Sequence, residues 1–164
     1  MLLTATQAAF NGLLELLDES LDLYQDLRER LPSTSRWEQL DTMLEQRRQL
    51  HFCLCQAAVK ELQIRPRAAD QDIEGLTHLL EKFRRLWQEP ERVALDLLLD
   101  HEQELEDAYQ EVVQGAKGDG GGGDGGGDKG DSDASGRTGF SSHLEQLLAD
   151  LGEHLQETRT WLQH

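Results

Sequence analysis

Four ionisable residues stand on the apolar stripes of three segments with helical periodicity: Arg47 and His51 in one, Glu102 in the next and His154 in the last. Each lies near the middle of its segment, at heptad spacing from apolar neighbours. In an antiparallel bundle the mid-helix positions share one level, so these four side chains are predicted to meet. Because burying an unpaired charge costs several kcal/mol, they should pair with one another or bind an ion.

Three interpretations of these residues are open. The first is a structural polar layer, in which Glu102 pairs with Arg47 or a histidine and fixes the register of the helices. The second is a metal site for iron, zinc or manganese, with His51, Glu102 and His154 as ligands and with Cys55, one turn after His51, as a further donor. The third is that one or more of the side chains extends to water.

Five stretches have the periodicity of amphipathic helices, and they are predicted at about 5–31, 36–63, 70–87, 90–114 and 140–162. Pro32 should end the first, because proline disfavours helical geometry in the residue before it. Ser35 stands three residues before Glu38, the spacing of a capping box at the start of the second.

Four of these helices are long, and each has a single apolar stripe that cannot be stable alone in water. A repeat close to 3.5 residues favours packing at about 20°. The short first turn makes the first two helices a hairpin, and the 70–87 segment becomes a crossover or cap. The sequence therefore predicts an all-α, antiparallel four-helix bundle with one domain spanning residues 1–164.

The 115–139 segment differs in composition, since it holds 12 of the 15 glycines and five aspartates, with no apolar residue larger than alanine. Such a segment cannot bury enough surface to offset its ordering entropy. It is predicted to be a flexible linker between the last two helices.

The charge and the cysteine content limit the classes of binding partner and the cellular compartment that are expected for this chain. The net charge is -16, which disfavours nucleic acid and anionic lipid as partners. No run of about 18 apolar residues is present, and no secretory signal is recognisable before Asn11. Cys53 and Cys55 point about 200° apart on a helix and cannot bridge there, which fits a reducing, cytoplasmic location.

Three short segments resemble those of small bacterial bundle proteins of unknown function that are classed as ferritin-like: Met43–Arg48, Ile73–His78 and Glu102–Tyr109. Ferritin-like bundles often place a carboxylate ligand and a tyrosine seven residues apart in one core helix, as Glu102 and Tyr109 stand here. The similarity covers most of the chain except the glycine-rich segment. It implies a ferritin-like topology, with Tyr109 in the buried polar layer beside Glu102.

The di-iron motif of that class is degenerate in this chain. Ferritin-like di-iron proteins carry Glu-x-x-His pairs on two helices and further carboxylates on the other two. Here Arg48 stands where a histidine would follow Glu45, and Leu151 stands where a glutamate would precede His154. A working ferroxidase or oxygen-activating centre is not expected, while a reduced site on Glu102 and a histidine stays open.

Three functions follow from these features. The first is a non-catalytic ferritin-like bundle that acts through contact with a protein partner or through self-association. The second is a metal-binding or redox protein with a site around Glu102. The third rests on the Trp37–Arg48 stretch, which resembles secretion or flagellar chaperones and would require an exposed apolar groove for a partner helix.

Overall fold

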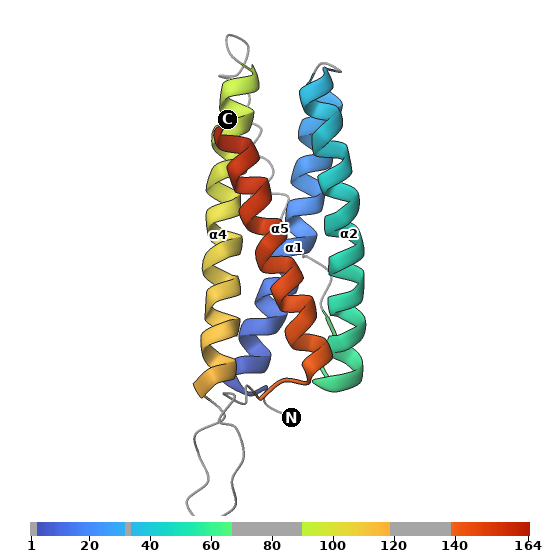
Figure 1. Ribbon diagram of the computed structural model, residues 1–164, viewed down its shortest axis with the longest axis vertical. Helices are drawn as coiled ribbons and strands as arrows, with labels where there is room; N and C mark the ends of the chain where they lie inside the picture. The colour runs from blue at the N-terminus through green and yellow to red at the C-terminus, as the bar shows by residue number, and fades with distance from the viewer. Residues whose placement is uncertain (1–2, 32–33, 67–89, 119–138) are drawn as a thin grey trace, which may run out of the picture.

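The described part of the chain folds as an all-α bundle of four helices, as predicted (Figure 1). A computed structural model describes residues 3–31, 34–66, 90–118 and 139–164. Its helices are α1 (Ala5–Arg30), α2 (Ser35–Glu61), α4 (Pro90–Gly118) and α5 (Ser142–Gln163). The predicted crossover helix at 70–87 and residues 119–138 of the predicted linker lie outside the described residues.

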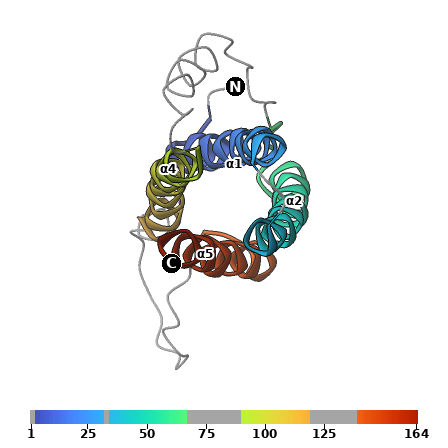
Figure 2. The same cartoon turned by 90° about the horizontal axis from the view of Figure 1, so that it is seen from above.

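The four helices form a closed ring in which each helix packs mainly against two others (Figure 2). Helix α1 packs against α2 and α4, and α5 packs against the same two helices. Helices α1 and α5 run in one direction, and α2 and α4 run in the other (Figure 1). All packed neighbours are therefore antiparallel, so the middles of the four helices face one another at one level.

Side chains cap the starts of α1 and α5, but not the start of α2, where the sequence suggested a capping box. Thr4 forms a capping box with Gln7 at the start of α1, and the Ser141 hydroxyl accepts the Leu144 amide at the start of α5. The capping box predicted at Ser35 is wrong. Helix α2 already includes Ser35, and the N-cap residue is Thr34, whose side chain makes no capping bond.

Helix α4 continues through Gly118, four residues beyond its predicted end. Ala116 is buried, and its carbonyl oxygen accepts a hydrogen bond from the Gly139 amide at 3.1 Å. Gly115 lies against α1 so closely that a Cβ atom there would come within 3.3 Å of the Thr6 hydroxyl oxygen. Packing against the first turn of α1 therefore extends a helix whose own last residues have poor helical propensity.

The apolar core has two halves with a polar layer between them. One half gathers residues near the start of α1, the end of α2, the end of α4 and the first two-thirds of α5: Phe10, Leu13, Leu14, Leu17, Leu54, Leu105, Val112, Leu144, Leu151 and Leu155 among them. The other half gathers the opposite ends: Tyr24, Leu27, Trp37, Leu40, Leu98 and Leu162 among them. The level between the two halves holds the buried polar side chains of Ser20, Arg47, Glu102 and His154.

Candidate functional site

A buried ion pair occupies the middle of the bundle. The Arg47 guanidinium of α2 grips the Glu102 carboxylate of α4 with two parallel hydrogen bonds, 2.6 Å from Nη1 to Oε1 and 2.9 Å from Nη2 to Oε2. Each of the two side chains is 1% exposed. This bidentate geometry is the strongest form of arginine–carboxylate contact, and it joins two helices that sit diagonally in the ring.

The other two helices complete the layer around this pair. From α1, the Tyr24 hydroxyl donates to Glu102 Oε1 at 2.7 Å, and Ser20 Oγ accepts from Arg47 Nη1 at 3.2 Å. From α5, His154 Nε2 lies 3.2 Å from Arg47 Nε. The Arg47 guanidinium carbon also lies 5.0 Å from the centre of the Tyr24 ring, in cation–π contact. One arginine therefore contacts all three of the other helices.

The hydrogen bond from Arg47 sets the protonation state of His154. Arg47 Nε–H can only donate, so His154 Nε2 must accept and the imidazole must be neutral, with its proton on Nδ1. Burial, and then the nearby guanidinium charge, lower the pKa of His154 to about 4, although Glu102 acts in the opposite direction. The layer therefore has one positive and one negative side chain at neutral pH, with a neutral histidine.

The same environment stabilises the charged arginine and the neutral tyrosine. Burial disfavours the guanidinium charge, but the Glu102 carboxylate and the Tyr24 oxygen outweigh it and raise the pKa of Arg47. Burial and the Glu102 charge raise the pKa of Tyr24 well above its ordinary value. Arg47, Tyr24 and His154 are therefore not poised to exchange a proton near neutral pH, which general acid–base chemistry would require.

Two residues that were predicted for this layer, His51 from its spacing and Tyr109 from the resemblance to ferritin-like bundles, lie elsewhere. His51 is half-buried between α2 and α1, with Nε2 3.4 Å from Cys55 Sγ on its own helix and with the Leu14 backbone as a further hydrogen-bond partner. Tyr109 is half-buried, and its hydroxyl packs so tightly on Gly152 of α5 that a Cβ atom there would come within 2.6 Å. The tyrosine that holds Glu102 is therefore Tyr24 and not Tyr109.

Ser20 and Tyr24 are the layer residues that the sequence analysis missed. Leu13, Leu17, Ser20, Tyr24 and Leu27 follow alternating steps of four and three, and all five are buried. An apolar stripe drawn through Leu21 instead of Ser20 hides this pattern. Correct heptad register on α1 would have revealed Ser20, but the tyrosine hydroxyl gives no periodic signal of its own.

The predicted metal ligands do not come together in the part of the chain that the structure describes. Arg47 and Tyr24 engage both oxygens of Glu102, His154 accepts from Arg47, and His51 faces α1. Within the described ranges, no group of three His, Cys, Asp or Glu side chains is placed to hold a metal ion. The three-residue site of His51, Glu102 and His154 is therefore not assembled, because an arginine takes the position beside the carboxylate.

The Cys55 thiol is not activated for chemistry by its surroundings. Burial raises the pKa of the Cys55 thiol to about 11, and the Asp18 charge adds to this effect. The thiol is therefore protonated at neutral pH and is a poor nucleophile. Cys53 is exposed.

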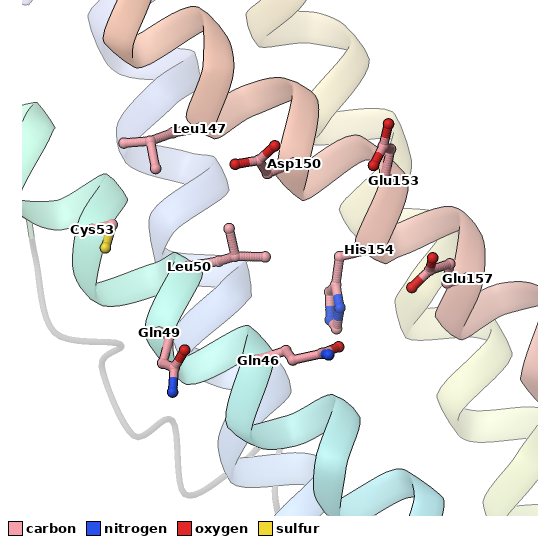
Figure 3. A pocket seen from close by; sticks show the side chains of 9 residues that line it. All are labelled: Gln46, Gln49, Leu50, Cys53, Leu147, Asp150, Glu153, His154 and Glu157. Atoms are coloured by element: carbon pink, nitrogen blue, oxygen red, sulfur yellow. The ribbon is translucent and has the colours of Figure 1, made fainter.

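A shallow groove between α2 and α5 runs past His154 (Figure 3). Leu50 and Leu147 are its apolar lining residues, and its α5 side carries Asp150, Glu153 and Glu157. The groove is thus acidic along one side and holds few apolar side chains.

The fold and the layer define the class of this protein as an all-α four-helix bundle with a buried ion pair at its centre. In comparisons with known proteins, no family model, curated protein or solved structure matches the chain. None of the described helices is sufficiently long and apolar to cross a membrane.

Proposed function

We propose that the protein is a non-catalytic helical bundle of the ferritin-like class that acts through contact with another protein chain. The bidentate Arg47–Glu102 pair carries this proposal. In a metal-binding bundle a buried carboxylate needs free oxygens to ligate the ion, whereas here a permanent cation of the chain itself neutralises Glu102.

The order of the helices supports the ferritin-like class. Helix α2 follows α1 as an antiparallel neighbour. Helix α4 then begins at the end of the bundle opposite to the one where α2 ends, so α2 and α4 run in the same direction (Figure 1). This arrangement requires one long connection between the second and third long helices, which is a feature of ferritin-like folds.

The surface of α2 supports action through a partner chain. Among the described residues, the large apolar side chains classed as exposed are Leu3, Phe52 and Val59, and the last two share one face of α2. Exposed apolar side chains grouped on one face are typical of protein interaction sites. A chaperone of the secretion or flagellar type is less well supported, because the groove between α2 and α5 is lined mostly by polar and acidic residues.

Metal analysis tests this proposal against the metal-binding alternative. Protein purified without chelator is expected to contain no stoichiometric iron, zinc or manganese. Adding each metal should leave the melting temperature unchanged, because a site that binds only the folded state would raise it.

The matched variants are Glu102→Gln and Glu104→Gln, which remove a buried and an exposed carboxylate of the same helix. Stoichiometric metal in the native protein that disappears only in Glu102→Gln would replace the proposed function with the metal-binding one.

A further inference from the structure

The charge of the chain is unevenly distributed over its helices. Helix α2 carries four acidic and four basic residues, whereas α1 carries six against two, α4 eight against two and α5 four against one. The chain as a whole has a net charge of -16, so two copies repel each other over most of their surface. Because Arg47 is buried, the remaining charged side chains of α2 are four acidic and three basic, so α2 is the described helix on which two copies repel each other least.

The outer face of α2 is also uncharged and apolar along its second half. Between Arg48 and Lys60 the helix holds no Asp, Glu, Lys or Arg. Phe52 is 63% exposed and Val59 is 52% exposed. At 100° per residue both lie roughly opposite Leu54, which is fully buried, so they point directly away from the bundle.

We infer that this outer face, formed by Phe52, Gln56 and Val59, is the surface on which a second copy of the chain docks. The inference rests on the proposed function and names its partner. A strongly basic partner would be drawn to α1, α4 or α5, where the acidic residues are concentrated. A neutral, apolar strip on an otherwise acidic molecule fits an identical strip better than a cationic surface, and twofold pairing is the commonest symmetry of homo-oligomers.

The charges at the two ends of the strip favour an antiparallel arrangement of the two α2 helices. With the twofold axis between Cys55 and Gln56, Phe52 of each copy faces Val59 of the other, and Lys60 of each copy lies at the level of the uncharged side chain of His51 of the other. A parallel arrangement would set Phe52 against Phe52, but it would also place Glu45 directly against Glu45. Like charges in direct apposition are unfavourable.

The dimer is expected to be weak, because one helix face is small compared with the roughly 1,600 Å² that a stable complex buries. Sedimentation velocity of the full chain at about 10 μM, 100 μM and 1 mM should show a reversible shift from monomer to dimer. Added salt should increase the dimer fraction, since it screens repulsion between the two acidic bodies.

The double variant Phe52→Gln/Val59→Gln should stay monomeric at every concentration while its melting temperature changes little. Leu3→Gln is the matched control, because Leu3 is 45% exposed but lies outside the strip, and its dimer should form as in the native chain. A dimer that persists in the double variant, or one that salt dissociates, would overturn the inference.

Disulfide cross-linking tests the face and the direction of the helices. In a Cys53→Ser/Cys55→Ser background, Gln56→Cys should form a covalent dimer under mild oxidation, while the exposed α4 position Gln110→Cys should not. Glu45→Cys distinguishes the two directions, because residue 45 of the two copies lies about 30 Å apart along antiparallel helices. Efficient cross-linking through Glu45→Cys would contradict the antiparallel arrangement.

The two proposals fail separately. A chain that stays monomeric under all these conditions ends the inference of a second copy but has no bearing on the metal measurements. Metal uptake through Glu102 ends the non-catalytic proposal even if the dimer forms.

Discussion

Glu102→Ala is expected to lower the free energy of unfolding by about 3–5 kcal/mol, because it leaves the Arg47 guanidinium buried without its counterion. The variant also removes the acceptor of the Tyr24 hydroxyl. Urea denaturation at neutral pH measures this effect directly. Glu104→Ala is the matched control, since Glu104 is exposed two residues further along the same helix and its loss should change stability by less than about 0.5 kcal/mol.

Replacing both charges should be far less harmful than replacing one. In Arg47→Met/Glu102→Leu no charge remains to be desolvated, so the double variant is expected to lie within about 1 kcal/mol of the native protein or to exceed it. The residual loss comes from Tyr24, Ser20 and His154, which lose a partner. If the loss of unfolding free energy in the double variant equalled the sum of the losses in Arg47→Met and Glu102→Leu, the two residues would not act as a pair.

The effect expected for Glu102→Leu alone differs from the effect of replacing a buried glutamate that lacks partners. A half-satisfied buried glutamate is better replaced by leucine, and Glu102→Leu alone would then be neutral or stabilising. Arg47 and Tyr24 satisfy both carboxylate oxygens, so the single Glu102→Leu variant should instead be destabilised. The difference lies in the partner that is left behind and not in the residue that is removed.

The polar layer has a consequence for the register of the bundle. If one helix slides by a single turn, Arg47 moves about 5.4 Å and enters the apolar half that contains Leu54 or the one that contains Leu44. An apolar side chain tolerates such a shift, but a guanidinium with fixed partners on three helices does not. The ion pair is therefore well suited to select one alignment of the four helices.

The sequence was informative about the layer because heptad spacing alone marks a charged residue on an apolar stripe. Arg47, Glu102 and His154 could be found in this way, and each one is buried. Their partners could not, since periodicity gives the level of a residue but not the direction in which its side chain extends. His51 lies one turn from Arg47 on α2, yet its ring extends toward α1 and not toward the centre.

The helix ends, too, could be predicted where local sequence determines them and not where contacts with distant residues do. Helix bounds followed from proline, capping residues and apolar periodicity to within two residues, apart from the end of α4. That end depends on contacts with Thr6 of α1 and on Gly139, which are distant in sequence. Local sequence indicated glycine-rich linker from residue 115, and tertiary packing extended the helix through it.

The stability of the protein should fall as the pH is lowered from about 6.5 to about 4, because of His154. In the unfolded chain this imidazole takes up a proton near its ordinary pKa of 6.5, whereas in the folded bundle it resists protonation until about pH 4. Between these values the unfolded state binds more protons, so acid favours unfolding. The shift corresponds to about 3 kcal/mol, fully present above pH 6.5 and lost by pH 4.

The comparison of variants isolates this effect from other titrating groups. Glu19 and Asp22 act in the opposite sense, because burial raises their pKa values. His154→Gln keeps an oxygen that can accept from Arg47 Nε but cannot titrate, so its stability should change less between pH 7 and pH 4 than that of the native protein. His143→Gln, at an exposed position of α5, should follow the native pH profile. Parallel profiles for His154→Gln and the native protein would mean that the imidazole is not held neutral by Arg47 in the folded state, and the donor–acceptor order of the layer would have to be revised.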